Sequence, residues 1–381
     1  MIKPNIFIIS GPHLDIDRKL SIGGLEKYID TLATKLASSG YKVYFHEISL
    51  SGDFEIERNG FINVGHNLPK KFKTSIPKIE KYIQKMPYYS PQNDVVIYST
   101  DYLAKYNFLS NSIAIQHGIA WDIPFEEKSF KNTLKPHFLF MSKVNILKKI
   151  DRLICVDYNY PNWLRATFPY KPLLNKIKVI PNFTAIKQIE PRHRNKEDEL
   201  KICFARRFED YRGALIFGDA ICLLSNKPFF DKLSFTFAGN GKLENYLRKK
   251  FENFKNVYFE RYDANNSIDF HSNFDIAVIP TIGSEGTSLS ALEAMSAGCA
   301  VLCTGVGGLS NIVIDQYNGI IIQPSSSSIA DSIETLFYNQ DLISFLSNNG
   351  HLVAKASFDE KLWFDRWTKV IEEFSDNENN K

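Results

Sequence analysis

The sequence predicts an α/β protein of two doubly wound, Rossmann-like domains that face each other across a cleft. The first observation is length, because 381 residues are too many for one ordinary hydrophobic core and fit two domains. The second is a series of short, continuous apolar runs that alternate with helical stretches, as in a parallel sheet covered on both faces. The third is an interruption, since this alternation stops at a polar, charged segment, residues 183–200, and then starts again.

The two domains are expected at residues 1–182 and 201–355, joined by the linker at 183–200. A helical tail at 356–381 is expected to cross back to the first domain. Each apolar run is bounded by turn-forming residues, which indicate where a strand ends. The predicted strands are 5–11, 41–48, 94–99, 112–118, 151–157 and 176–182 in the first domain, and 201–208, 233–241, 257–262, 274–281, 300–305 and 319–324 in the second.

Composition and cysteine usage exclude several classes of protein. With 44% hydrophobic and 23% charged residues, the chain is a folded globular protein and not a disordered or fibrous one. The first ten residues hold too short an apolar run for a signal peptide, and no run is long enough to span a membrane. The five cysteines mostly lie in apolar, strand-like runs without CxxC spacing, which predicts free thiols in a reducing cytoplasm: Cys155, Cys203, Cys222, Cys299 and Cys303.

Charge is distributed unevenly along the chain. Residues 1–182 hold 25 lysines and arginines against 16 aspartates and glutamates, an excess of nine positive charges, so with a net charge of +3 the remainder carries −6. The excess is sharpest at 67–85, with six lysines and one glutamate. From Ile76 onward this segment can form a helix with isoleucines on one face and lysines on another. It is either an ordinary solvated surface or a patch for anionic lipid head groups or a phosphate-bearing acceptor at the inner face of the membrane.

The stretch "GSEGTSLSALEAMSAGCAVLCTGVGG" (283–308) predicts a strand, a glycine turn and a helix start near Thr287. Free backbone N–H groups at such a start bind phosphate. Glu285 and Glu293 lie on either side of it, which suits a ligand with hydroxyls at both ends of a diphosphate, such as a nucleotide sugar. On spacing alone, a dipole-capping Glu285 and a solvated Glu293 are the favoured alternative. The predicted ligand-binding positions at the turn are Gly286, Thr287, Ser288 and Leu289.

Other residues at predicted strand ends support a diphosphate site. Arg206, Arg207 and Arg212 follow a strand end, and two arginines five apart in a loop can converge on a diphosphate, although solvated surface arginines are the alternative. His117 ends another strand, where it either meets a sugar hydroxyl or has a structural role. The glycines proposed to allow close approach of a ligand to the backbone are Gly23, Gly24 and Gly239.

Together these segments resemble the family 4 glycosyltransferases, retaining enzymes of the GT-B fold. The resemblance covers most of the chain and is strongest at 201–324. "EGTSLSALE" is similar to the family's E-x7-E element, and "RFEDYRG" is similar to its pattern of an arginine followed five residues later by a lysine and a glycine. "IPN", the paired glycines before the first helix, the histidine and "GVGGLSNIVIDQYNG" also fall in the family's order.

The resemblance implies a role for each matched residue. Arg207 and Arg212 would neutralise the donor diphosphate, and Glu293 would bind the ribose hydroxyls. Glu285 would hold hydroxyls of the donor sugar, which His117 would approach from the first domain. The implied reaction transfers a sugar from a UDP-, GDP- or dTDP-sugar to a hydroxyl of a glycan or glycolipid with retention of configuration. The implied setting is synthesis of lipopolysaccharide O-antigen or capsule.

The sequence departs from the family pattern at three positions. Arg212 replaces the usual lysine, Asn311 stands where a glutamate is frequent, and Arg261 stands where a glycine is common. "DID" (15–17) resembles the metal-binding DxD of a different glycosyltransferase fold, but it lies in the first loop and is interpreted as acceptor loop or surface. No metal or other cofactor, and no nucleic acid, is expected.

Two other classes of function are compatible with this fold. One is a sugar-nucleotide epimerase or hydrolase, or a phosphorylase, although no cofactor lysine for a phosphorylase is identified. The other is a degenerate transferase that only binds a partner, which the joint presence of both glutamates, both basic residues and the histidine disfavours.

Overall fold

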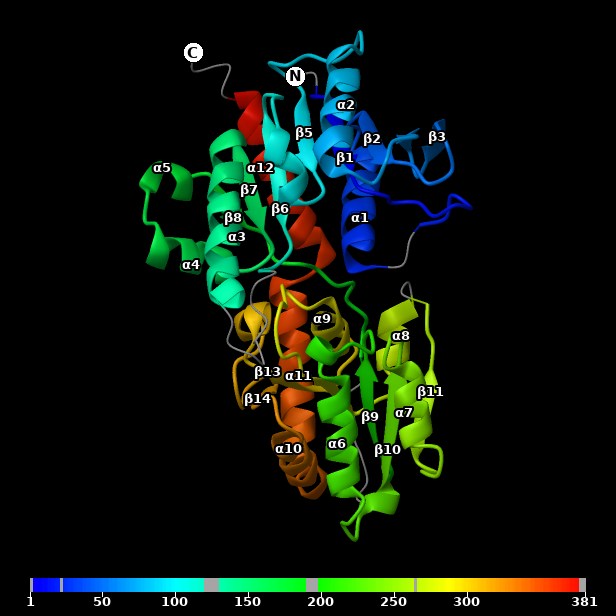
Figure 1. Cartoon of the computed structure of the whole chain (residues 1–381). Coiled ribbons are helices and arrows are strands. Elements are labelled where there is room, and N and C mark those ends of the chain that lie inside the picture. Colours follow the sequence, from blue (N-terminus) through cyan, green and yellow to red (C-terminus); the bar gives the residue numbers. More distant parts are fainter. Residues whose placement is uncertain (1–2, 21–22, 120–129, 190–197, 264–265, 377–381) are drawn as a thin grey trace. The chain divides into compact units, whose positions relative to one another are not determined.

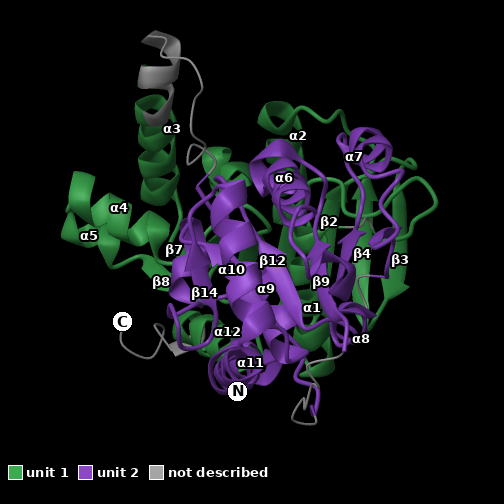
Figure 2. Ribbon diagram, turned by 90° about the horizontal axis from the view of Figure 1, so that it is seen from below, with its two compact units in different colours: residues 1–117, 127–180, 364–381 green, residues 118–126, 181–363 purple. Residues whose placement is uncertain are grey.

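The computed structural model describes residues 3–20, 23–119, 130–189, 198–263 and 266–376. The chain divides into two compact units (Figure 2). Unit 1 contains residues 1–117, 127–180 and 364–381, and unit 2 contains residues 118–126 and 181–363. Part of the predicted linker, residues 190–197, lies outside the described residues.

Unit 1 is built on one sheet whose strand order is β3-β4-β2-β1-β5-β6-β7-β8 (Figure 1). All neighbours pair in parallel except β3 and β4. The central strands are continuously apolar and buried, as expected for strands covered on both faces. The strands are β1 Ile6–Ser10, β2 Val43–Ile48, β3 Phe54–Arg58, β4 Phe61–His66, β5 Val95–Tyr98, β6 Ser112–Gln116, β7 Arg152–Cys155 and β8 Ile177–Val179.

The helices of unit 1 connect these strands or cover the sheet. Among the described residues they are α1 Gly24–Ser38, α2 Phe72–Gln84, η1 Asp101–Tyr106, α3 Phe130–Lys149, α4 Asn159–Thr167 and α5 Lys171–Leu174. Helix α12 (Glu360–Asp376) belongs to this unit from residue 364 onward. There Trp367 is fully buried, and its indole N–H donates to the hydroxyl of Tyr28 on α1 at 2.9 Å.

The β3–β4 hairpin was not predicted, although the sequence carries its signal. Residues Asn59 and Gly60 form the turn, with φ of 51° and 82°. Two consecutive residues with positive φ are typical of a type I′ turn, for which Asn-Gly is the preferred pair. The flanking segments alternate apolar and polar residues, as in "FEIER". The sheet of unit 1 therefore ends in one antiparallel edge strand.

Unit 2 has a parallel sheet of order β11-β10-β9-β12-β13-β14. Its strands are β9 Leu200–Ala205, β10 Leu233–Ala238, β11 Val257–Glu260, β12 Ile276–Ile279, β13 Ala300–Thr304 and β14 Ile320–Ile322. Its helices are η2 Asp210–Arg212, α6 Ala214–Leu224, η3 Phe230–Lys232, α7 Glu244–Lys250, α8 Ser267–His271, α9 Leu289–Ser296, η5 Gly307–Asn311, α10 Ser326–Tyr338 and α11 Gln340–Ser357. Every strand predicted from an apolar run is present, and the α/β class with two Rossmann-like sheets is confirmed.

Two separate cores cover the two faces of the unit 2 sheet. Along β9, Ile202 and Phe204 enter a core with α6, α7 and α10, and this core is rich in phenylalanine. Cys203 and Ala205, which alternate with them, enter the other core with α9. That second face carries small residues, among them Ala277 and Ala291, so that α9 lies close to the sheet. The alternation of side chains along one strand thus positions α9 over the sheet.

The strand order places a topological switch point beside β9. This strand lies between β10 and β12, so the loops that leave the carboxyl ends of β9 and β12 run in opposite directions. Ligands bind at such points in open α/β sheets because the two diverging loops leave a crevice. The loop after β9 begins at Arg206, and the loop after β12 leads through Glu285 to α9.

Helix α2 presents an apolar face to the core and a basic face to solvent. It begins at Phe72, four residues before the predicted start, and Ile76, Ile79 and Ile83 on it are fully buried. The lysines of the segment are all exposed: Lys70, Lys71, Lys73, Lys78, Lys81 and Lys85.

The buried face of α2 also carries one carboxyl group, that of Glu80, which has no exposed surface. Oε1 of Glu80 lies 2.5 Å from the hydroxyl of Tyr98, and that hydroxyl lies 2.7 Å from Oδ1 of Asn107. Oδ1 of Asn107 is an acceptor, because it already accepts from the N–H of Leu109. The single hydroxyl proton of Tyr98 can serve only one of its two acceptors, so the other contact requires a proton on Glu80. Burial likewise raises the pKa of Glu80 to about 7, although Tyr98 and Lys149 act against this.

We predict that Glu80→Gln stabilises the protein at pH 8 and removes a pH dependence of stability. A carboxyl whose pKa is raised on folding binds its proton more tightly in the folded state, so its contribution is complete below the unfolded pKa and is lost as pH rises toward about 7. The loss is on the order of 3 kcal/mol for a shift of this size. The measurement is urea unfolding from pH 5 to 8. Equal pH dependence in wild type and variant would show that Glu80 is ionised in the folded protein.

Candidate active site

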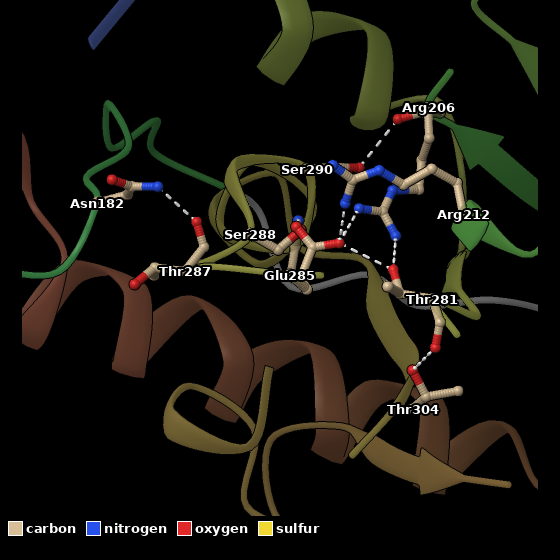
Figure 3. Close-up of polar contacts among 11 residues, drawn as sticks. Asn182, Arg206, Arg212, Thr281, Glu285, Thr287, Ser288, Ser290 and Thr304 are labelled. Atoms are coloured by element: carbon tan, nitrogen blue, oxygen red, sulfur yellow. Dashed lines mark hydrogen bonds and ion pairs between the residues drawn. The ribbon is translucent and has the colours of Figure 1, made fainter. Parts of the chain in front are cut away.

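The carboxylate of Glu285 lies at the centre of a charged cluster in unit 2 (Figure 3). Its residue is 7% exposed. Oε2 accepts hydrogen bonds from Arg206, from Nη1 of Arg212 at 2.5 Å, and from the hydroxyl of Thr281 at 2.8 Å. Burial alone would raise the pKa of Glu285, but the two guanidinium groups and the hydroxyl outweigh it and hold that pKa below its usual value. Glu285 is therefore an anion whose charge is already compensated within the unit.

The arginines around Glu285 differ from those that the sequence pattern indicated. Arg206 reaches both Glu285 and Thr281, and only 6% of its side chain is exposed. Arg207, predicted together with Arg212 to meet the diphosphate, is exposed, and its side chain makes no hydrogen bond or ion pair with the described residues. Both arginines lie in the loop directly after β9, and Arg206 is the one whose guanidinium reaches Glu285. The diphosphate role of Arg207 stays a prediction, and Arg206 is the residue that spacing alone missed.

Helix α9 begins at Leu289, two residues later than predicted. The hydroxyl of Ser288 caps the helix by accepting from the N–H of Ala291 at 3.4 Å, and Ser288 and Thr287 are almost fully buried. The preceding loop is held by Asn182, whose side-chain amide donates to the carbonyl of Thr287 at 2.6 Å. The first-turn N–H groups of Leu289 and Ser290 meet no acceptor among the described residues, so this helix start has the donors that an anion requires.

Glu293 is 8% exposed on α9, which excludes the alternative of a solvated helix residue. Its charge acts on two neighbouring groups. It raises the pKa of Tyr262 further, beyond the larger effect of burial, and it opposes the lowering that burial causes in the pKa of His271. Tyr262 in turn stacks on Phe270, with ring centroids 4.4 Å apart. The second glutamate of the predicted pair therefore lies in an aromatic setting, while the first lies among arginines.

Several glycines let the loops of unit 2 pack closely. A Cβ at Gly307, which has φ of 59°, would lie 2.1 Å from the carbonyl oxygen of Glu285, and one at Gly308 would collide with the backbone of Gly286. A Cβ at Gly239 would lie 2.3 Å from the carbonyl oxygen of Arg206. Contact between loops is thus enough to require these glycines, and the predicted approach of a ligand to Gly239 stays a prediction.

In unit 1, His117 follows β6 and stands next to α1. Its Nε2 lies 2.9 Å from the carbonyl oxygen of Ser99, and its ring meets Tyr28 edge-on at 5.3 Å. A carbonyl can only accept, so Nε2 carries the hydrogen and Nδ1 keeps its lone pair. Burial lowers the pKa of His117 to about 4, against smaller opposing effects of Ser99 and Asp101. The imidazole is therefore neutral near pH 7 and offers one acceptor.

The remaining predicted positions of unit 1 lie at the start of α1 and in the first loop. Gly24 is the first residue of α1, and Gly23 precedes it in an extended conformation. In the "DID" segment, Oδ1 of Asp15 accepts from the backbone N–H groups of Asp17 and Lys19 at 2.9 and 2.8 Å. Within the described ranges, no group of three or more His, Cys, Asp or Glu side chains is arranged to hold a metal ion. No helix in that part of the chain is long and apolar enough to cross a membrane.

Comparison with known proteins agrees with this architecture. Residues 185–352 match a family described as glycosyl transferases group 1. The uncharacterized glycosyltransferase MJ1069 of Methanocaldococcus jannaschii is 25% identical over 378 residues, covering 92% of this chain and 95% of the relative. The O-antigen biosynthesis glycosyltransferase WbnH of Escherichia coli is 26% identical over 160 residues, 42% of this chain and 44% of the relative. The crystal structure of Anabaena Alr3699/HepE in complex with UDP has a TM-score of 0.72 at 15% identity, covering 97% of this chain and all of that chain.

The two Rossmann-like units and these relatives identify the protein as a transferase enzyme of the glycosyltransferase class with a GT-B type of fold. The match to the glycosyl transferases group 1 lies within residues 185–352, and so within unit 2.

We predict that His117 titrates with a midpoint below pH 5 and is the Nε2–H tautomer at pH 7. Burial opposes its protonation, and its contact with the carbonyl of Ser99 requires a hydrogen on Nε2. Long-range ¹H–¹⁵N NMR correlations of the imidazole, recorded from pH 4 to 8 and assigned with His117→Gln, measure both properties. The exposed His137 is followed in the same spectra as the internal control. A His117 midpoint above pH 6 would contradict the assignment.

Proposed function

We propose that the protein transfers a sugar from a nucleoside-diphosphate sugar to a hydroxyl of a glycan or glycolipid, with retention of anomeric configuration. The observation that carries the proposal is the state of Glu285. Three donors converge on one of its oxygens and hold it ionised, so it cannot act as a general acid, and the two guanidinium groups compensate the charge that a nucleophile would use. A carboxylate of this kind suits recognition of hydroxyl groups.

The positive groups lie where the leaving group would gain charge. When the bond between the anomeric carbon and the diphosphate oxygen breaks, the electron pair stays on the diphosphate. Arg212 is a donor suited to that charge, and so are the N–H groups at the start of α9, which meet no acceptor among the described residues. The acceptor hydroxyl then forms the new bond on the same face of the sugar and gives its proton to the leaving phosphate. No carboxylate nucleophile is needed in this scheme.

The two glutamates and His117 are proposed as hydroxyl-binding groups. Glu293 is proposed for the ribose and Glu285 for the transferred sugar. His117 is proposed to bind a sugar hydroxyl through its acceptor nitrogen. UDP is the first nucleotide to test, because HepE, which has a similar fold, was crystallised with it. The similarity to WbnH motivates a role in O-antigen or capsule synthesis in the cytoplasm, at the inner face of the membrane. The reaction is proposed to need no metal.

We predict that Glu285→Gln and Glu285→Ala lower kcat for sugar transfer by at least about a hundredfold, the usual effect of removing one preorganised polar contact. Glu285→Ala also leaves two cations without their partner, which costs roughly 3–5 kcal/mol of stability, so Glu285→Gln is the cleaner variant. Transfer is measured with a panel of nucleotide sugars and glycan acceptors. Glu252→Ala, an exposed carboxylate of the same unit, is the matched control.

The same assay separates the competing functions. Release of nucleoside diphosphate that is equal with and without acceptor would indicate a hydrolase. Turnover of Glu285→Gln at the wild-type rate would remove the basis of the assignment. Folding is checked by circular dichroism, and nucleotide binding by the rise in Tm that any ligand specific for the native state produces.

We further propose that the exposed lysines of α2 and the preceding loop bind an anionic membrane that carries the acceptor. Six of them lie within 70–85. Each lysine near such a surface contributes about 1 kcal/mol of attraction, and this attraction is screened by salt.

We predict that replacing Lys70, Lys71, Lys73 and Lys78 by glutamine abolishes sedimentation with vesicles containing phosphatidylglycerol at low salt. Each replacement removes one of the charges that attract the lipid head groups. The matched control replaces four exposed lysines of unit 2 or its flanks: Lys249, Lys255, Lys355 and Lys361. Equal binding by both variants and wild type would refute the membrane patch.

A further inference from the structure

The two arginines on Glu285 are held in different ways. Arg206 uses two nitrogens, with Nη1 donating to the hydroxyl of Thr281 and Nη2 to Oε2 of Glu285. Thr281 in turn contacts Glu285, because its hydroxyl donates to the same Oε2 at 2.8 Å. These bonds close a ring of three residues (Figure 3). The guanidinium of Arg212 makes one bond, from Nη1 to Oε2, and its other nitrogens meet no acceptor among the described residues.

The two arginines also differ in burial, and Arg206 is the more buried of the two. The side chain of Arg206 is 6% exposed and that of Arg212 is 17% exposed. Thr281 has no exposed surface, and its carbonyl accepts from the hydroxyl of Thr304 at 2.6 Å, so the threonine itself is fixed. Arg212 comes from the short turn η2, where its guanidinium also lies over the ring of Tyr211 at 4.8 Å. Arg206 is thus part of the buried frame, and Arg212 stands at its edge.

The charge balance around Glu285 indicates which arginine can leave it. One carboxylate neutralises one of the two guanidinium groups, which leaves one positive charge in excess. The negative charge of an entering diphosphate can be compensated by this excess cation and by the start of α9. One guanidinium can therefore leave Glu285 for the diphosphate, provided that the other remains paired with Glu285. Arg206 is the one whose departure would break two bonds and leave Thr281 without its donor. All three donors lie on Oε2, and Oε1 receives no hydrogen bond from the described residues.

We propose that Arg206 and Arg212 divide the work. Arg206, with Thr281, is a positioning residue that keeps Glu285 ionised and turns its Oε1 toward the hydroxyls of the transferred sugar. Arg212 moves from Glu285 to the diphosphate when the donor binds. This inference rests on the proposed sugar transfer and adds that recognition of the sugar and of the diphosphate depend on different arginines.

The test compares Arg206→Met, Arg212→Met and the control Arg165→Met in the full chain. Affinities for UDP, GDP and dTDP are measured by calorimetry, and the nucleotide that wild type binds most tightly is used throughout, together with its sugar donor. Arg212→Met should lower the affinity for the nucleoside diphosphate by about tenfold or more, the effect of one lost charge-assisted contact. Arg206→Met should change that affinity by less than about twofold, yet lower kcat/KM for the sugar donor by roughly a hundredfold. Arg165→Met, an exposed arginine of α4 in unit 1 to which no role is assigned, should match wild type in both measurements.

Two further readouts separate positioning from loss of folding. The acid limb of the kcat/KM profile should shift to higher pH in Arg206→Met, because Glu285 loses a cation that lowers its pKa. Thr281→Val, which keeps the shape but removes the hydroxyl, should lower kcat/KM for the donor with the diphosphate affinity unchanged. Arg206→Lys should restore part of the activity and the position of the acid limb, and it replaces Arg206→Met if that variant does not fold.

Each outcome decides a separate statement. The proposed difference between the two arginines would be overturned if the Arg206 variant, Met or Lys, and Arg212→Met weakened binding of the nucleoside diphosphate equally. Both arginines would then be phosphate ligands. Activity of the Arg206 variants equal to that of Arg165→Met would overturn it as well. In either case, transfer by wild type would leave the proposed function intact. A wild type that binds none of the three nucleotides and transfers no sugar would refute the proposed function itself.

Discussion

The interaction on which the candidate site depends is the buried ion pair of Glu285 with two arginines. Taking a carboxylate out of water costs several kcal/mol unless donors replace its hydration. Here one oxygen of Glu285 meets two guanidinium groups and a hydroxyl, and the pKa of the carboxyl falls although burial alone would raise it. The partners come from the ends of β9 and β12 and from η2. The charge state of the site is therefore a property of the folded sheet.

The backbone around this pair is built for close contact between loops. Gly213 has φ of 80°, and a Cβ there would lie 2.0 Å from the carbonyl oxygen of Pro280, so the turn that carries Arg212 rests directly on the loop after β12. Gly307 and Gly308 pack in the same way against Glu285 and Gly286. Because glycine tolerates these conformations without a side-chain clash, the charged groups can approach one another. The glycines of this region are therefore needed for the close packing of its loops.

Sequence patterns predicted the elements far better than the contacts. Each apolar run became a strand because continuous burial on both faces of a parallel sheet leaves a signal that is local in the sequence. The β3–β4 hairpin was missed, although Asn59-Gly60 marks its turn. The choice between Arg206 and Arg207 could not be made from spacing. The choice depends on which side chain reaches Thr281 after β9 ends, and Thr281 lies 75 positions beyond Arg206 in the sequence.

The sequence by itself determined the two Rossmann-like sheets, the helix start before Glu293 and the residue types available for binding a diphosphate sugar. Tertiary structure decided which of them act together, because the two arginine partners of Glu285 lie 79 and 73 positions away in the sequence and reach it only where β9 and β12 are neighbours in the sheet. It also decided charge states, since the protonation of Glu80, the neutrality of His117 and the ionisation of Glu285 follow from burial and from the donors each group meets after folding.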